Sequence, residues 1–409
     1  MPTSRVLPPA YTEGALDAAA STRSNPIDFR VRLPALDGLR GLAILAVFAF
    51  HYAGGGPQHP GSLVLKLMYG FTRFGWAGVD LFFVLSGFLI TGILYDTKDD
   101  PRYFRNFYLR RSLRIFPVYY AFVLVIGIVG ALAGVRWTFG HLSFFAYLGY
   151  PATLIWPELV PDTPLIRITH LWSLCVEEQF YMVWPLLVFV LSSSRRILLL
   201  CGAYVSLALG MRLLIWQTGW VSPEWAITFL PFRMDSLALG GALAILVRGP
   251  RIATVTQVAP VILGCAGVCL FGLCLIAPTT MYTDPSMWTL GFTLISLVSA
   301  SLVLLAIQPG GVVRWLFSGR FLRAFGKYSY GMYVYHFPLL ALLTPMRSPL
   351  LSVLGSEVLA KVTFVLASLA INFALAFASF RYFESPILKL KSRFDYDRNS
   401  APRPAGVLV

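Results

Sequence analysis

Long apolar stretches separated by short polar segments recur from Gly38 almost to the end of the chain. Each strong stretch is close to the roughly 20 residues that an α-helix needs to cross a bilayer. They predict ten membrane-spanning helices at 37–56, 76–95, 115–135, 171–191, 197–216, 226–247, 255–277, 289–307, 328–345 and 360–381. An eleventh stretch, 141–156, is shorter and contains Pro151. The pattern therefore predicts an all-α fold, a polytopic transmembrane helical bundle of about ten spans.

The distribution of Lys and Arg decides whether the eleventh stretch spans the membrane. With ten spans and a cytoplasmic N-terminus, fourteen of these residues fall in inside loops and five in outside segments, as the positive-inside rule requires. An eleventh span would move Arg195, Arg196 and the basic stretch 314–327 to the outside. We therefore expect both termini in the cytoplasm, and we expect the segment 136–170 to lie at the outer interface.

The two ends of the chain differ from the part between them. Residues 1–33 are polar and small and lack the apolar core of a signal peptide, which predicts a disordered cytoplasmic tail. Residues 34–390 hold all the predicted spans, and 391–409 are expected to form a second cytoplasmic tail.

Composition narrows the classes of protein that fit. Hydrophobic residues make up 57% of the chain and charged residues 13%, about half the charged fraction of an average soluble domain. The net charge of +14 does not indicate nucleic-acid binding, because the basic residues lie in short stretches between spans. Membrane lipids and a phosphorylated substrate are the expected partners for them. The five cysteines lie inside apolar stretches without zinc-ligand spacing, so no metal site is expected.

Ionisable groups inside the spans are the first functional candidates, because each costs about 2.5–3.5 kcal/mol to insert. His51 follows Arg40 by eleven residues, which places it roughly 16 Å further toward the outer side. Glu177 and Glu178 lie about two turns below the outer surface in the span at 171–191. His51 and one glutamate are thus expected at one depth, as a base and the group that orients it. A packed histidine without chemistry is the alternative.

The spans hold further polar residues. Asp80 lies near the outer end of the second span and Ser86 near its middle. Arg233 and Asp235 are expected to form a structural ion pair or to take part in the chemistry. His336 lies among aromatic residues, which indicates a structural role or a place in the substrate lining.

The segment RYFRNFYLRRSLRIFP, before and into the third span, contains five arginines interleaved with aromatic residues. Guanidinium groups suit phosphate and pyrophosphate. A positive-inside anchor with an interfacial aromatic belt is the alternative, and it accounts for part of the cluster. We favour the binding of a phosphorylated donor by Arg110, Arg111 and Arg114.

These residues belong to seven motifs that occur in a fixed order. The motifs are LDGLRGLAILAVFAFH, GVDLFFVLSGFLIT, FYLRRSLRIFPVYY, HLWSLCVEEQFY, FRMDSLALG, GKYSYGMYVYHFPL and RYFESPI. Between about Leu36 and Leu390, the chain resembles acyltransferase family 3, the membrane O-acyltransferases that modify surface polysaccharides, O-antigens and some secreted small molecules. The resemblance identifies 34–390 as a transmembrane acyltransferase domain.

The resemblance implies roles for individual residues. His51 would be the catalytic histidine, as a general base or a transient acyl carrier, and Arg40 its essential partner. Glu177, the first acid of its motif, would orient the imidazole, and Arg110 and Arg111 match paired arginines at the cytoplasmic side. The expected substrate-binding residues are Arg110, Arg111, Arg114, Asp80, Ser86, Glu178, Arg233, Asp235 and His336.

The resemblance also implies the reactants and the location. The donor would be an acyl-CoA, with acetyl-CoA favoured, and no tightly bound cofactor is expected. The acceptor would be a hydroxyl of a carbohydrate or another alcohol at the outer side of a bacterial inner membrane. A transporter or flippase that relays protons through His51, Glu177 and Asp235 is the alternative, but the chain lacks the two related halves common in transporters.

Overall fold

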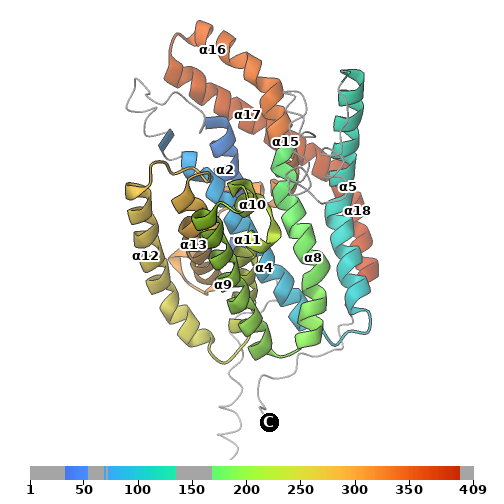
Figure 1. Cartoon of the computed structure of the whole chain (residues 1–409). Helices are drawn as coiled ribbons and strands as arrows, with labels where there is room; N and C mark the ends of the chain where they lie inside the picture. The colour runs from blue at the N-terminus through green and yellow to red at the C-terminus, as the bar shows by residue number, and fades with distance from the viewer. Residues whose placement is uncertain (1–32, 54–68, 71, 135–167, 397–409) are drawn as a thin grey trace, which may run out of the picture. The chain divides into compact units, whose positions relative to one another are not determined.

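The computed structural model describes residues 33–53, 69–70, 72–134 and 168–396 (Figure 1). This described part is helical, and ten of its helices are long and apolar enough to cross a membrane. The ten predicted spans each overlap one of them, so the predicted fold class is confirmed. The weak stretch 141–156 and most of both predicted tails lie outside the described residues, and the orientation of the termini stays a prediction.

The spans are numbered in chain order, and several are extended by a short 3-10 or π-helical turn. They are α2 (Pro34–Ala53), η1 with α4 (Phe74–Ala77, Gly78–Asp96), α5 (Tyr103–Leu132), η3 with α8 (Thr169–Leu171, Trp172–Leu191), α9 (Ser194–Thr218), α10 with α11 (Pro223–Thr228, Leu230–Leu246), α12 (Ile252–Ile276), η4 with α13 (Met287–Gly291, Phe292–Ile307), α15 with α16 (Arg320–Leu343, Arg347–Leu354) and α17 (Glu357–Ser379) with the turns that follow it. The short helix α14 (Val312–Phe317) connects α13 to α15.

Four helices form the centre: α2 packs on α15, α4 packs on α11, and α2 also contacts α4. Glycines make the two tight contacts possible. A methyl group on Gly41 or Gly326 would overlap the backbone of the facing helix at the α2–α15 contact, and the same holds for Gly87 and Gly240 at the α4–α11 contact. Small residues allow this close backbone approach, which stabilises helix pairs in a bilayer.

The peripheral helices bury one side only. Helix α12 packs on α13 and lies at the edge of the bundle in Figure 1. Its buried residues are Ala259 and Ala266, whereas Val261, Val268 and Phe271 are exposed. An exposed apolar surface of this kind suits lipid rather than water. The chain is therefore an integral membrane protein.

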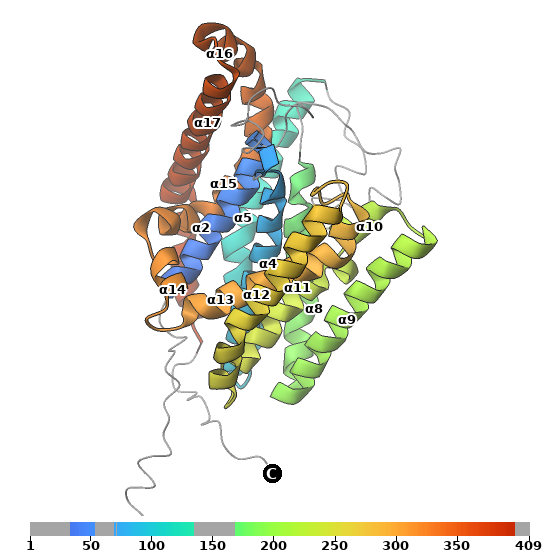
Figure 2. The same cartoon turned by 90° about the vertical axis from the view of Figure 1, so that its left-hand side faces the viewer.

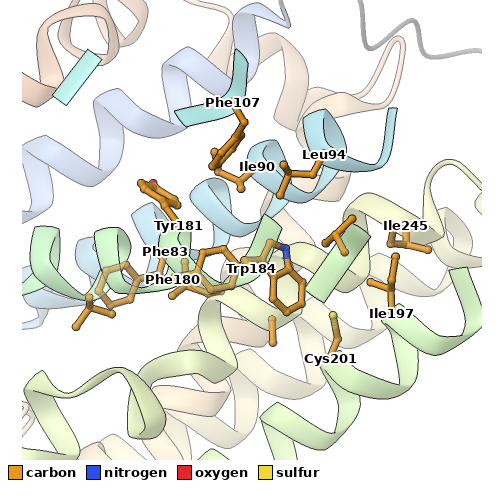
Figure 3. Packing of buried hydrophobic residues seen from close by; sticks show 14 of the residues in the cluster. Phe83, Ile90, Leu94, Phe107, Phe180, Tyr181, Trp184, Ile197, Cys201 and Ile245 are labelled. Carbon is orange, nitrogen blue, oxygen red and sulfur yellow. The ribbon is translucent and has the colours of Figure 1, made fainter. Parts of the chain in front are cut away.

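A hydrophobic cluster fixes the position of α8 between α4, α9 and α11 (Figure 3). Phe180 and Trp184 stack with ring centroids 4.9 Å apart. The indole Nε1 of Trp184 donates a hydrogen bond to Thr91 Oγ1 of α4, at 2.8 Å. Because Glu177 lies two turns before Trp184 on the same helix, this packing also sets the depth of its carboxyl group.

The described C-terminal residues continue the helical structure beyond the last span. Residues 391–394, expected to begin a cytoplasmic tail, belong to the 3-10 helix η7 (Leu390–Phe394), which follows α18 (Ser385–Lys389). Both elements contact α5. The polar start of α5 therefore packs against the end of the chain.

Candidate active site

Two cavities lie among the central helices. We call the larger one, of about 330 Å³, the histidine cavity. It is lined by Val47, Phe50, His51, Trp76, Val79, Asp80, Thr169, His170, Trp172, Glu224, Ile227, Thr228, Arg233, Tyr282, Thr283, Phe292, Tyr333 and Phe337.

We call the smaller one, of about 90 Å³, the arginine cavity. It is lined by Arg40, Val79, Phe82, Phe83, Ser86, Arg111, Arg114, Ile115, Ser173, Leu174, Glu177, Glu178, Tyr181, Ser329, Tyr330 and Tyr333. Val79 and Tyr333 line both cavities and form a shared wall.

His51 lies in the last turn of α2 and lines the histidine cavity. Its Nδ1 is 2.9 Å from the carbonyl oxygen of Val47, one turn earlier on the same helix. A carbonyl can only accept a hydrogen bond, so Nδ1 carries the proton in the neutral ring and Nε2 carries the lone pair. The helix itself thus selects the tautomer that leaves Nε2 as the basic and nucleophilic atom.

Two further histidines pack behind His51. The His336 ring of α15 is 4.9 Å from the His51 ring, and the His170 ring of η3 is 5.1 Å from that of His336, centroid to centroid. His336 is fully buried and its Nδ1 is 2.6 Å from the carbonyl oxygen of Tyr333. In the described part of the chain, neither His336 Nε2 nor His170 Nδ1 has a hydrogen-bond partner. His336 supports His51 and is not among the residues that line the cavity.

The expected pair of His51 and Glu177 is not formed. His51 lines the histidine cavity, whereas Glu177 lines the arginine cavity, beside Ser86, Tyr181 and the guanidinium of Arg111. The reason is depth: His51 is two residues from the end of α2. Glu177 lies seven residues beyond His170, about 10 Å further along the helix axis. His170, not a glutamate, reaches the level of His51.

The arginine cavity concentrates charge. Three guanidinium groups, from Arg40, Arg111 and Arg114, face two carboxyl groups, from Glu177 and Glu178. Arg111 lies over the ring of Tyr181 at 5.0 Å, and the Tyr181 hydroxyl is hydrogen-bonded to that of Ser86.

The remaining contacts of this cavity hold its walls. Arg114 forms an ion pair with Glu384, with Nη1 and Oε2 3.7 Å apart. By contrast, one carboxylate oxygen of Glu178 has no hydrogen-bond partner among the described residues. The guanidinium groups in the lining, those of Arg40 and Arg111 above all, suit an anionic ligand.

Arg110 does not join this cavity. Its guanidinium forms an ion pair with Asp395 and also donates to the carbonyl oxygens of Lys391 and Phe394, at 3.3 and 3.4 Å. Neighbouring helix residues diverge by about 100°, so Arg110 and Arg111 face different ways from α5. Arg110 therefore holds the C-terminal segment, while Arg111 and Arg114 are placed for a ligand.

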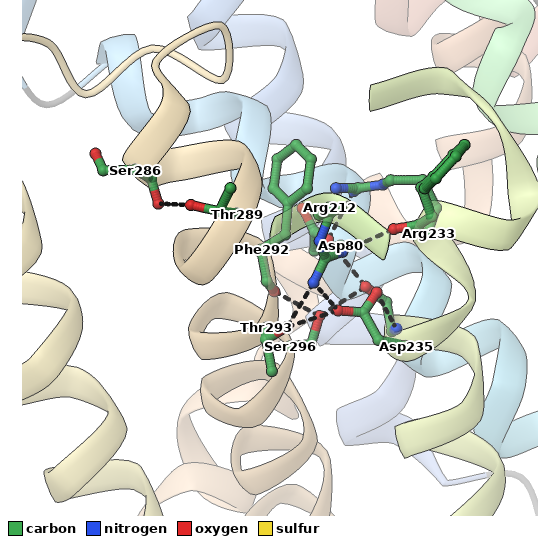
Figure 4. Close-up of polar contacts among 11 residues, drawn as sticks. Asp80, Arg212, Arg233, Asp235, Ser286, Thr289, Phe292, Thr293 and Ser296 are labelled. Atoms are coloured by element: carbon green, nitrogen blue, oxygen red, sulfur yellow. Dashed lines mark hydrogen bonds and ion pairs between the residues drawn. The ribbon is translucent and has the colours of Figure 1, made fainter. Parts of the chain in front are cut away.

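Arg233 and Asp235 do not pair with each other. Figure 4 shows instead two separate buried ion pairs: Arg233 with Asp80, at 2.7 Å, and Arg212 with Asp235, at 2.6 Å. Residues two apart on a helix point in nearly opposite directions, which prevents the predicted pairing. Thr293 joins the second pair by hydrogen bonds to both Arg212 and Asp235.

The two ion pairs differ in what they face. Asp80 and Arg233 line the histidine cavity, and neither Arg212 nor Asp235 lines either cavity. Asp235, expected among the substrate-binding residues, is therefore outside the lining of both cavities. Within the described residues, no group of three or more His, Cys, Asp or Glu side chains is arranged to hold a metal ion.

Comparison with known proteins agrees with the motifs. Residues 33–381 match the model of a family described as an acyltransferase domain. The chain belongs to this acyltransferase family. The family resemblance and the class of enzyme predicted from the sequence are thereby confirmed.

The acyltransferase also has curated relatives. A peptidoglycan O-acetyltransferase of Listeria monocytogenes is 29% identical over 391 residues, which cover 88% of this chain and 56% of the relative. A putative peptidoglycan O-acetyltransferase of Bacillus subtilis is 27% identical, with 87% and 55% covered. A putative O-acetyltransferase of Staphylococcus aureus is 25% identical, with 87% and 57% covered. The chain thus spans about half the length of these relatives. No solved structure matches it.

The residues that come together in the acyltransferase are not the groups that were expected to meet. Arg40, Glu177, Glu178, Arg111, Arg114 and Ser86 gather at one cavity, and His51, Asp80 and Arg233 gather at the other. Sequence reasoning missed His170, although it is the first residue of HLWSLCVEEQFY and directly precedes the predicted span. It also gave no role to the aromatic residues that line the histidine cavity.

Proposed function

We propose that this acyltransferase transfers an acyl group from an acyl-CoA, with acetyl-CoA favoured, to a hydroxyl of a surface carbohydrate. The donor is held at the arginine cavity and the acceptor at the histidine cavity. The observation that carries the proposal is that two cavities of different character share the wall formed by Val79 and Tyr333. The names of the relatives, which are O-acetyltransferases, support acetyl as the acyl group and a cell-wall polysaccharide as the acceptor class.

The charge of the arginine cavity supports its assignment to the donor. Coenzyme A carries several phosphate oxygens, and guanidinium groups bind such oxygens in pairs. The cavity is about 90 Å³, far below the roughly 300 Å³ at which a whole drug-sized ligand is enclosed. The nucleotide therefore stays at the mouth, near Arg111 and Arg114, and only the thioester arm enters the bundle. Glu177 and Glu178 share the lining with the arginines and offset part of their charge.

His51 supplies the chemistry in this proposal. As a base, Nε2 removes the proton from the acceptor hydroxyl while the oxygen attacks the thioester carbonyl; the C–S bond breaks and the CoA thiolate takes up the proton. As a nucleophile, Nε2 attacks the thioester carbonyl and the CoA thiolate leaves; the acceptor hydroxyl then takes the acyl group from the imidazole and gives up its proton. In both cases the hydrogen bond from Nδ1 to the carbonyl of Val47 holds the ring in place and stabilises the imidazolium. Ring contacts with His336 restrict its rotation further. The orienting group is thus a backbone carbonyl, where a carboxylate was expected.

The test uses purified protein in proteoliposomes with radiolabelled acetyl-CoA and cell-wall glycan. We expect His51→Ala to abolish label transfer to the glycan while an Asp395→Asn control, which changes the C-terminal contact only, retains it. Transfer at the normal rate by His51→Ala would refute the role of His51. Uptake of a labelled glycan precursor without ester formation would favour the transporter alternative. Acid quenching during turnover, followed by peptide mapping, separates an acyl-histidine from general-base catalysis.

The topology is part of the proposal. An acceptor outside the cell requires His51 at the outer side of the inner membrane and both termini inside. A tag inserted at residues 192–196 should then be accessible only after the membrane is permeabilised. Reaction of the tag in intact cells would show that the orientation in the membrane is the reverse of the proposed one.

A further inference from the structure

Each of the two buried ion pairs of the acyltransferase joins an arginine to an aspartate. Only the Asp80–Arg233 pair lines the histidine cavity. Arg233 donates from Nη2 to Asp80 Oδ1, and the Ser236 hydroxyl donates to the same oxygen, at 2.7 and 3.0 Å. Asp80 Oδ2 and the Nε and Nη1 of Arg233 have no hydrogen-bond partner among the described residues. Leaving such groups buried and unpaired is costly. Since both residues line the histidine cavity, a ligand there would satisfy them.

In the second pair, neither carboxylate oxygen of Asp235 is without a hydrogen-bond partner. Asp235 accepts from Arg212, from Thr293 and from the backbone N–H of Ser236, so both of its oxygens are occupied. Arg212 Nη1 donates to the carbonyl of Phe232 and Nη2 to Asp235 and Thr293, and only its Nε lacks a partner. This pair connects α9, α11 and α13, and it provides a matched structural control.

Aromatic rings surround the unused polar groups. The guanidinium of Arg233 lies 3.6 Å from the centroid of the Phe292 ring, and Trp76, Trp172 and Tyr282 also line the cavity. Burial raises the pKa of the Tyr282 hydroxyl above its usual value, so it stays neutral. A cavity with apolar flat walls and a few fixed donors and acceptors is the usual form of a small-ligand site. The flat apolar face of a sugar ring fits such walls.

The charge of the lining selects between classes of sugar. The lining holds two carboxyl groups, those of the buried Asp80 and the exposed Glu224, and one guanidinium, that of Arg233, which already pairs with Asp80. A phosphate or carboxylate would therefore meet a net negative surface. The volume of about 330 Å³ is at the lower limit of ligand pockets, which suits one ring with its substituents.

We propose that the Asp80–Arg233 pair binds one uncharged sugar ring of the acceptor and presents a neighbouring hydroxyl to His51. Asp80 Oδ2 accepts a hydrogen bond from one ring hydroxyl, and Arg233 donates to the oxygen of an adjacent substituent. This inference rests on the proposed function, but sugar binding itself needs no donor and can be measured separately.

Isothermal titration calorimetry on the purified chain in lipid nanodiscs tests the site with three tetrasaccharides: cellotetraose, chitotetraose and the anionic tetragalacturonate. We expect saturable binding of at least one uncharged tetramer and weaker binding of the anionic one. The double variant Asp80→Asn/Arg233→Gln should weaken binding of the uncharged tetramer by at least about tenfold, because it removes charge-assisted hydrogen bonds. Arg212→Gln/Asp235→Asn should leave that dissociation constant within about twofold of the parent.

A second pair of variants changes no charge. Trp172→Phe alters the cavity wall as well as the edge of the hydrophobic cluster around α8, whereas Trp184→Phe alters that cluster but not the cavity wall. The first should weaken sugar binding and the second should not, provided that both variants show the helical circular dichroism of the parent.

Equal effects of the two double variants, tighter binding of tetragalacturonate, or no binding of any uncharged tetramer would each overturn the proposal. Loss of acetyl transfer with intact sugar binding would instead count against the proposed function.

Discussion

Replacing Gly240 by Ala tests how far glycine packing determines the stability of the bundle. In a helix interior, Ala is favoured over Gly by about 1 kcal/mol. At Gly240, however, the new methyl group would overlap the backbone of Val84 on α4. Backbone cannot rotate away as a side chain can, so the helices must separate. Overpacking costs about 1–3 kcal/mol in a packed interior.

The net effect follows from these two terms. Contact with backbone places the overpacking cost at the upper end of its range, so Gly240→Ala should destabilise the protein by about 2 kcal/mol. The matched control is Gly264→Ala on α12, where nothing lies within 4 Å of the added methyl. There the propensity term acts alone, and stability should rise by up to about 1 kcal/mol.

The assay is reversible unfolding of the purified chain in mixed micelles, titrated with sodium dodecyl sulfate and followed by tryptophan fluorescence. Because α4 and α11 also carry Asp80 and Arg233, Gly240→Ala should lower acetyl transfer as well. If Gly240→Ala is as stable as Gly264→Ala, the close approach of α4 and α11 does not limit stability, and the reasoning from backbone contact is refuted.

Three further predictions concern the site. Arg111→Ala should raise the KM for acetyl-CoA at least about tenfold in a transfer assay, whereas Arg110→Ala should mainly expose the C-terminal segment to limited proteolysis; equal effects on KM would contradict the separation of the two arginines. Glu177→Gln should raise the KM for the donor more than the KM for the acceptor, because the carboxyl lies at the arginine cavity. A larger rise in the KM for the acceptor would instead support Glu177 as the partner of His51. His336→Asn should lower kcat with little change in either KM, because it restrains the His51 ring, and an unchanged kcat would remove it from the mechanism.

Much of the bundle was predictable because hydropathy reports directly on lipid exposure. The start of α5 was not: hydropathy placed it at 115, but the helix begins at Tyr103. The additional turns contain the arginine-rich segment. Its arginine and aromatic side chains let the helix continue beyond the apolar core, because their apolar parts stay buried while their polar ends reach water. The early start of α15, at Arg320 rather than 328, has the same cause. A hydropathy window finds the lipid-spanning part of a helix and misses its polar extension.

The residues of the site were predictable, but not their partners. Intramembrane cost singles out Asp80, Arg233 and Asp235 one by one. Which of them pair depends on the rotation of α11 against α4 and α9, and that rotation is set by packing between residues far apart in the chain. His51 and Glu177 were placed at one depth because span limits were uncertain by a turn or two. A shift of two turns is about 11 Å, similar to the roughly 10 Å along α8 that separates Glu177 from His170.

The wall between the cavities has a consequence for the cell's energy supply. Tyr333 is held there by hydrogen bonds, since its hydroxyl lies 2.5 Å from that of Ser173 and donates to the carbonyl oxygen of His170 at 2.9 Å. A cavity lies on each side of it: His51, near the end of α2, lines one, and Arg40, near its start, lines the other. A gap wide enough for an acyl chain would also admit water, and with it protons driven by about 2.3 kcal/mol per charge for each 100 mV. If the proposed donor and acceptor sites are right, transfer across this wall preserves the membrane potential only when the substrate itself fills each opening.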